Sequence, residues 1–172
     1  AYHHPSQPFQ LDADRYEMVS LGQEVLSPYS KADADGQPVH RLPGRAGQPL
    51  PYLGYAPGAY LGRVTELILK QSQTPIHLER VYETDMAEGL KAMALEGHGL
   101  AFLPASSVRK EVSVRRLVPA GPRQAQQAFE VTIEVRLYRE RPEVSRHNKP
   151  AAQALWDFLK LDLQRRQTTP SG

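Results

Sequence analysis

The sequence predicts an α/β fold, because segments with the pattern of strands alternate with segments with the pattern of helices. Residues 50–55 form a short apolar run, and a Pro-Gly turn then leads to apolar residues at helical spacing from Tyr60. Residues 76–83 are a second strand candidate, a helix over 85–97 follows, and residues 99–104 have the apolar character of a buried parallel strand. Strands joined through helices pair in parallel, so we expect a largely parallel sheet.

Two further segments predict strands that connect two lobes. Residues 15–29 have apolar residues spaced for two short strands around Gly22, which we interpret as a pivot. Residues 129–138 alternate apolar and polar side chains, as in a strand with one buried and one solvent-exposed face. Two such strands are typical of a hinged ligand-binding cleft. The predicted division is lobe I over 1–23 and 129–166, lobe II over 24–128, and a disordered tail over 167–172.

Capping residues mark the ends of the predicted helices. Asp85 and Glu88 have the spacing of a capping box, and Gly97 is the expected C-terminal cap of the same helix. Asn148 is the expected N-cap of a last helix, with Pro150 in its first turn. The stripe expected to be buried on that last helix comprises Ala152, Leu155, Trp156, Leu159 and Leu163.

The composition excludes several classes of site. The 172 residues include 21 basic and 19 acidic side chains, for a net charge of +2, so charge alone indicates no nucleic-acid surface. Cysteine is absent, which excludes disulfides, thiolate metal ligands and cysteine nucleophiles. The six histidines show no metal-ligand spacing, so we expect no metal site and no cofactor. No apolar run reaches the roughly 18 residues that a membrane span needs, so we expect no membrane partner.

The chain starts at Ala1 without an initiator Met and without the charged-then-apolar pattern of a signal segment. We therefore expect further residues upstream and no export.

Several stretches resemble the LysR-type transcriptional regulators. Residues 84–104, TDMAEGLKAMALEGHGLAFLP, resemble the place in that family where a helix ends in a glycine-containing turn and enters a strand closed by Leu-Pro. Residues 21–28 resemble the family's crossover between lobes, 116–118 the strand after its short helix, and 148–161 its closing helix. Residues 60–63 and the end of the first run are most similar to the hypochlorite-responsive members.

The resemblance implies the type 2 fold of periplasmic binding proteins, with two Rossmann-like lobes joined by two crossover strands and a first lobe truncated on its N-terminal side. It implies an effector-sensing and oligomerisation domain that reads a small molecule or an oxidant in the cleft between the lobes, as a homodimer or homotetramer. A winged helix-turn-helix that is absent from this chain would bind DNA, and the protein would be cytoplasmic.

Two helix starts are the candidate effector site, because a helix N-terminus offers unpaired N–H groups and a partial positive charge. One start lies near Gly58 and the other near Asp85. The family pattern supplies a hydroxyl residue near the first start. Ala56 and Ala59 occupy that turn here, so we expect a less polar pocket.

Five side chains at these turns are candidates for contact with an effector. Tyr55 and Tyr60 offer aromatic walls with a hydroxyl each, although ordinary core or interface positions would also explain them. Thr84 and Asp85 follow a strand and precede a helix, where ligands bind in α/β sheets, although capping alone would account for both. Met86 lies at the same edge, with burial on a helix face as the alternative.

Two histidines complete the candidate effector residues. His4 belongs to a His-His pair at an expected strand end and could reach the cleft, but such a pair before proline can equally face solvent. His98 lies in a Gly-His-Gly turn, where it could bind an anion or report pH, with a capping or exposed role as the alternative.

Methionine is the residue available for oxidant sensing, since cysteine is absent. Oxidation of its thioether to a sulfoxide makes an apolar side chain polar and disturbs packing. The redox-sensing candidates are Met18, Met86 and Met93.

Two other functions stay open. A solute-binding protein would use the same kind of cleft in another compartment. An enzyme on a similar two-lobed scaffold would need reactive groups, but the sequence has no nucleophile elbow, phosphate-binding glycine loop or paired catalytic carboxylates. We therefore expect no enzyme activity.

Overall fold

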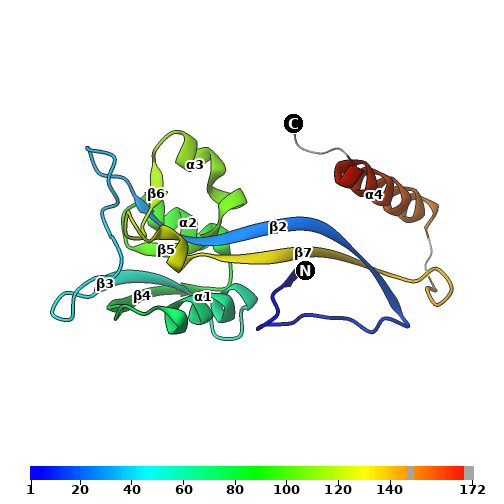
Figure 1. Ribbon diagram of the computed structural model, residues 1–172, viewed down its shortest axis with the longest axis horizontal. Coiled ribbons are helices and arrows are strands. Elements are labelled where there is room, and N and C mark those ends of the chain that lie inside the picture. The colour runs from blue at the N-terminus through cyan, green and yellow to red at the C-terminus, as the bar shows by residue number, and fades with distance from the viewer. Residues whose placement is uncertain (147–148, 169–172) are drawn as a thin grey trace. The chain divides into compact units, whose positions relative to one another are not determined.

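The structure is a computed structural model that describes residues 1–146 and 149–168 (Figure 1). Strands and helices alternate along the chain, as the sequence predicts. In the part of the chain that is described, no helix is both long enough and apolar enough to cross a membrane.

The chain divides into two compact units. Unit 1 comprises Ala1–Gln23 and Glu134–Gly172, and unit 2 comprises Glu24–Ile133. Strands β2 (Tyr16–Lys31) and β7 (Val131–Glu140) contribute residues to both units. The chain therefore passes from one unit to the other along these two strands.

The sheet of unit 2 is mixed. Strand β3 (Leu50–Tyr55) pairs in parallel with both β4 (Leu78–Thr84) and β5 (Leu100–Pro104). The second half of β2 pairs antiparallel with β5 and with β6 (Leu117–Pro119). The largely parallel sheet that we predicted is therefore wrong in part, because the long strand that enters the unit runs against its neighbours.

Helices join the strands of unit 2. Helix α1 (Tyr60–Gln71) connects β3 to β4, and α2 (Ala87–Leu95) connects β4 to β5. The later, shorter elements are η1 (Ala105–Val108), α3 (Arg109–Ser113) and η2 (Gln126–Phe129).

Both faces of strand β3 are buried. Leu53 and Tyr55 belong to an apolar core that includes Leu90 and Ala94 of helix α2. Successive side chains of a strand point to opposite faces, so Tyr52 faces the other way. There its ring meets Phe102 edge-on, with ring centroids 6.4 Å apart. A strand that is buried on both faces needs apolar side chains at nearly every position. This explains why β3 and β5 are near-continuous apolar runs in the sequence.

Unit 1 contains β1 (Tyr2–His3), which pairs antiparallel with β7, and helix α4 (Pro150–Thr168). Strand β7 lies between β1 and β2 in the sheet order. The Arg139 guanidinium lies 4.6 Å from the ring centroid of the buried Trp156, and its Nε donates to Glu17. This cluster attaches α4 to the strands of the unit.

Two local predictions are corrected by the structure. The two short strands expected around Gly22 are one continuous strand, because glycine adopts a φ of +136° there without ending the pairing. The capping box of Asp85 and Glu88 is wrong, because the N-cap of α2 is Met86 and no side chain caps the helix. Thr84 instead accepts a hydrogen bond from the Met86 amide on its Oγ1, at 3.3 Å.

The buried stripe predicted on the last helix is wrong for most of its residues. Trp156 is buried, whereas Ala152 is exposed and Leu155 is 58% exposed. Adjacent helical residues point about 100° apart, so a helix that packs through Trp156 turns Leu155 away. Leu159 and Leu163 are half-buried. The predicted N-cap, Asn148, lies outside the described residues, as do the tail residues 169–172.

Candidate functional site

The turn after β3 brings two strand ends and two helix starts together. Tyr55 pairs with Thr84 in the β3–β4 register, and the Ala56 amide donates to the Thr84 carbonyl at 2.9 Å. Gly58 has a φ of +87°, which a side chain would strain, and it turns the chain into α1. The carboxyl ends of both strands therefore lie at one edge of unit 2, next to the N-termini of α1 and α2.

The start of α1 is open to an acceptor. Its N-cap, Ala59, has extended backbone angles and makes no side-chain capping bond, and the first turn holds no acidic residue. The first N–H groups of a helix lack partners within the helix and carry a partial positive charge. This N-terminus can therefore interact with an anion or with an oxygen acceptor.

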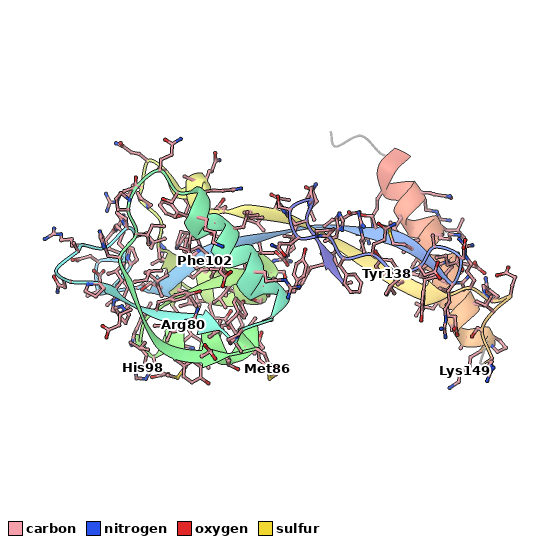
Figure 2. All side chains as sticks on the ribbon, turned by 90° about the horizontal axis from the view of Figure 1, so that it is seen from below. Arg80, Met86, His98, Phe102, Tyr138 and Lys149 are labelled. Atoms are coloured by element: carbon pink, nitrogen blue, oxygen red, sulfur yellow. The ribbon has the colours of Figure 1, made fainter. Side chains whose placement is uncertain are left out.

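The start of α2 lies at the neighbouring strand end. Asp85 is exposed and Met86 is 63% exposed. Burial of Met86 on a helix face, the alternative that we considered, is therefore wrong. A Cβ at Gly89 would lie 3.2 Å from Thr84 Cγ2, so the glycine lets α2 start close to the strand end. Figure 2 shows Met86 at the edge of the unit.

The two candidate tyrosines have different surroundings. Tyr55 is 3% exposed, and its hydroxyl donates to the Phe102 carbonyl at 3.0 Å inside the core. Tyr60 is half-buried at the first position of α1, and the Arg63 guanidinium lies 5.5 Å from its ring centroid. A structural role accounts for Tyr55, whereas Tyr60 lies at the surface of the candidate site.

The two candidate histidines lie apart from these turns along the chain. His4 belongs to unit 1, and its Nδ1 accepts a hydrogen bond from the Ser6 amide at 3.1 Å. His98 is exposed and follows α2, at the opposite end of that helix from Met86 (Figure 2). Within unit 2, the structure thus brings Gly58, Ala59, Tyr60, Thr84, Asp85 and Met86 together but leaves His98 outside the group.

The three methionines differ in accessibility. Met86 is the most exposed, and Met18 is 41% exposed. Met18 lies beside a cavity of about 330 Å³ in unit 1, with Tyr138 in its lining. Met93 is half-buried against the core that α2 covers. An oxidant in solution would therefore reach Met86 and Met18 before Met93.

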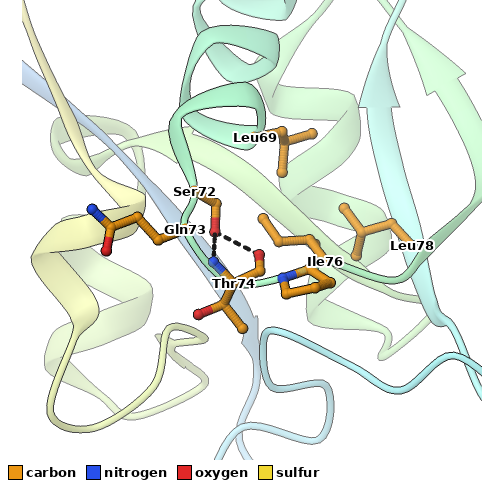
Figure 3. Close-up of a pocket in the computed structure, with 7 residues that line it drawn as sticks. Leu69, Ser72, Gln73, Thr74, Ile76 and Leu78 are labelled. Carbon is orange, nitrogen blue, oxygen red and sulfur yellow. Dashed lines mark hydrogen bonds between the residues drawn. The ribbon is translucent and has the colours of Figure 1, made fainter.

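Loop residues line a further cavity of unit 2. This cavity, of about 400 Å³, follows the end of α1, where Ser72 Oγ donates to the Thr74 carbonyl at 2.8 Å and accepts from its amide at 3.3 Å (Figure 3). The Ser72 hydroxyl and the backbone of Thr74 are therefore hydrogen-bonded to each other.

In the described ranges, no group of three or more His, Cys, Asp or Glu residues could hold a metal ion.

No sequence pattern indicates the small cavity that lies between β3, β4 and α1. Its lining includes Tyr52, Arg63 and Arg80. These residues are distant in the sequence and form no motif. Arg80 reaches Tyr52 only through the parallel register of β3 and β4, which local patterns do not specify.

The chain is similar in sequence to known transcriptional regulators. The family described as the LysR substrate binding domain matches residues 10–164. The HTH-type transcriptional regulator YjiE of Escherichia coli (strain K12) is 25% identical over 146 residues, which is 84% of this chain and 44% of that protein. The HTH domain-truncated transcriptional regulator QseD of Escherichia coli O157:H7 is also 25% identical over 146 residues, with 84% and 55% covered. The chain thus spans about half the length of these relatives.

The fold has solved counterparts. The regulatory domain of HypT from Salmonella typhimurium, in its apo form, superposes with a TM-score of 0.73 at 24% identity, over 92% of this chain and 68% of that one. At that identity the likeness shows the fold, which is the type 2 fold of periplasmic binding proteins. The family match, in contrast, covers most of the sequence. The chain therefore belongs to the LysR substrate binding domain family, the effector-binding domain of LysR-type transcriptional regulators.

Proposed function

We propose that this domain recognises its effector at the shared edge of β3 and β4, and that it controls DNA binding by a winged helix-turn-helix elsewhere in the complete regulator. The observation that carries the proposal is the convergence of two helix N-termini at this edge, joined by the bond from the Ala56 amide to the Thr84 carbonyl. Ligands of open α/β sheets bind at the carboxyl ends of strands.

The composition of the edge favours a small, weakly polar or anionic effector. Alanine occupies positions 56 and 59, where a hydroxyl side chain would clamp an oxyanion. Backbone N–H groups, the Thr84 hydroxyl and the Tyr60 ring remain as the contacts. His4 belongs to unit 1, and His98 follows the far end of α2. Both therefore lie outside this edge, and they would contact the effector only by approaching it from elsewhere.

An oxidant is the second candidate signal. A structural counterpart, full-length HypT of Salmonella typhimurium, is described as a hypochlorite-specific LysR-type regulator. In this chain Met86 lies at the proposed effector edge and is exposed. Conversion of its thioether to a sulfoxide would place a strong acceptor beside the start of α2. Met18 and Met93 are secondary candidates.

The signal would pass through the strands that join the units. An effector that binds one arrangement of the regulator more tightly shifts the population toward it, and a coupling of about 1 to 3 kcal/mol is enough for a graded response. The regulator would act in the cytoplasm as a homodimer or homotetramer on its promoter DNA. No membrane partner is proposed.

The rival functions have less support. A solute-binding protein and an enzyme of the same fold would each share this scaffold, since a fold does not determine a function. The family match favours the regulator over both.

Promoter binding by the complete regulator tests the proposal. We expect a specific shift of its own upstream DNA that changes with hypochlorite or with a small organic acid, at one fixed salt concentration. In the variant Met86→Leu the response to hypochlorite should fall, whereas Met93→Leu should retain most of it. Absence of promoter-specific binding under every condition would refute the regulator function. Binding that no treatment changes would refute the sensing role.

A further inference from the structure

A cavity of about 760 Å³ lies in unit 2 between the turn that ends helix α1 and the segment that precedes strand β7. One wall comes from residues 71–74, and the other comes from residues between 122 and 130, which include the short helix η2. Pro43 completes the lining. A helix of 12 residues is about 18 Å long, so the length of α1 separates this cavity from the effector edge at the start of that helix.

The cavity has an excess of negative charge. Glu130 is the one charged side chain in the described lining, to which no lysine, arginine or histidine contributes. Arg136, the nearest basic residue along the chain, donates to Glu134 at 2.7 Å. Arg123, the next nearest, donates to Gln37. The basic side chains closest in the sequence therefore have other partners, and Glu130 keeps its charge in the cavity.

The Glu130 carboxylate is held in place through one of its two oxygens. Its Oε1 accepts from the Ser27 hydroxyl at 2.9 Å and from Gln126 Nε2 at 3.0 Å. Ser27 is buried, and its Oγ also accepts from Gln126 Nε2 at 2.9 Å, so the three side chains fix one another. Within the part of the chain that the structure describes, no protein group donates to Glu130 Oε2. An ionised carboxylate accepts through both oxygens, so Oε2 remains for a ligand.

The end of α1 adds partial negative charge to the opposite wall. The helix ends at Gln71, and its C-cap, Ser72, has extended backbone angles. The last carbonyl groups of a helix lack partners within the helix and carry a partial negative charge. Lys70, the basic residue of the last turn, is exposed and does not belong to the lining. Both walls therefore favour a cation.

The rest of the lining suits an organic cation better than a metal ion. Calcium and magnesium take six or more oxygen ligands, with several carboxylates among them. In the described ranges no three His, Cys, Asp or Glu residues come together in that way. The lining instead combines one carboxylate with the amides of three glutamines and with apolar side chains. The apolar members are Pro43, Pro122, Ala125, Ala128 and Phe129.

We infer that this cavity binds a small organic cation that carries a primary ammonium group on a short apolar chain. The ammonium donates to Glu130 Oε2, and the apolar chain lies against the prolines and alanines of the lining. An ammonium has three N–H donors, and the glutamine amide oxygens are acceptors for the other two. This site goes beyond the proposed effector edge, because it lies at the other end of α1 and includes none of residues 84–86.

The test is a titration of the full 172-residue chain with n-butylammonium chloride, followed by amide chemical shifts at constant ionic strength kept with sodium chloride. We expect saturable shifts that centre on residues 71–74 and 125–130. Glu130→Gln should weaken the apparent affinity by about tenfold, because it keeps an acceptor for Ser27 but loses the hydrogen bond to an ionised group. The matched control is Glu96→Gln, which removes one exposed carboxylate at the end of α2 in the same unit and should leave the affinity unchanged.

Three outcomes would overturn the inference. The first is the absence of saturable shifts in these two segments. The second is equal affinity in Glu130→Gln and in the control. The third is equal affinity for 1-butanol, the neutral counterpart of the probe, which would mean that the cavity binds an apolar chain without recognising charge.

A second variant decides if Glu130→Gln lowers the thermal midpoint strongly. Ala128 is exposed in the lining, so Ala128→Lys adds an ammonium that competes for Glu130 without disturbing the core. Weaker binding of n-butylammonium by Ala128→Lys supports the inference, and unchanged binding overturns it. None of these results depends on promoter binding.

Discussion

Unit 2 and unit 1 differ in how much apolar side-chain surface they bury. Unit 2 contains nearly all of the fully buried large side chains, among them Leu53, Leu90 and Leu103. Of the buried hydrophobic residues in the described chain, Trp156 alone belongs to unit 1. Helix α4 of unit 1 leaves Leu155, Phe158 and Leu161 more than half exposed. Unit 2 therefore has an apolar core of its own, which can hold a binding site rigidly.

The largest expected effect is the loss of a core leucine in unit 2. Leu103→Ala should lower the free energy of unfolding by about 2 to 5 kcal/mol, since it removes a fully buried side chain. The matched change in unit 1, Leu155→Ala, should cost no more than about 0.5 kcal/mol. Urea unfolding followed by circular dichroism measures both. Equal costs would contradict the difference between the units.

The single tryptophan allows the two units to be followed separately. Trp156 fluorescence reports unit 1, whereas far-ultraviolet circular dichroism reports the whole chain. We expect the fluorescence midpoint in urea to come at a lower concentration, because unit 1 buries less apolar surface on folding. Coincident transitions would show that the units unfold together, as one cooperative structure.

The next effect concerns close packing within unit 2. Gly54→Ala should destabilise the chain by about 1 to 3 kcal/mol, because its Cβ would press on Arg80 and on the Tyr52 ring. The control is Gly47→Ala, where nothing lies within 4 Å of the added carbon. Thermal unfolding of both variants measures the difference. A neutral Gly54→Ala would mean that Arg80 moves aside freely.

A smaller effect separates the two residues before α2. Thr84→Ala should cost about 1 kcal/mol, since the Met86 amide loses the hydroxyl that accepts its hydrogen bond. Asp85→Ala should be close to neutral, because Asp85 makes no capping bond to α2. Denaturant unfolding of the two variants is the measurement. A larger cost for Asp85→Ala would restore the capping box that the structure rejects.

The smallest effect is a dependence on pH in unit 1. A hydrogen bond from Arg136 lowers the pKa of Glu134, and a second from Ser20 lowers it further. A carboxyl whose pKa is lowered by folding stabilises the native state above its unfolded pKa. That contribution is lost as the pH falls through the folded pKa. Glu134→Gln should therefore flatten the acid side of the stability curve for unit 1, measured by Trp156 fluorescence. An unchanged acid limb would contradict this assignment.

The strands and helices of unit 2 could be predicted where local patterns decide them. The Pro-Gly turn before α1 forms as its sequence indicates, and so do the helix and strand between Thr84 and Pro104, although the predicted capping box is absent. The mixed pairing of β5 and the buried face of α4 could not be predicted, because they depend on partners distant in the sequence.

The candidate site was predictable to a similar extent. The sequence indicates that strand ends and helix starts meet near Gly58 and Thr84, since residue types at turns are read locally. The core role of Tyr55 and the exposure of Met86 follow from packing that the sequence does not show. The cavity of Arg63 and Arg80 requires the register of two paired strands and the approach of a helix.

Hydrogen exchange of the complete regulator tests the central claim most directly. The measurement compares the protein with and without whichever treatment alters its promoter binding. The account predicts that protection changes most in residues 55–62 and 84–90, at the shared edge of β3 and β4. Changes confined to unit 1, with this edge unaffected, would contradict effector recognition in unit 2.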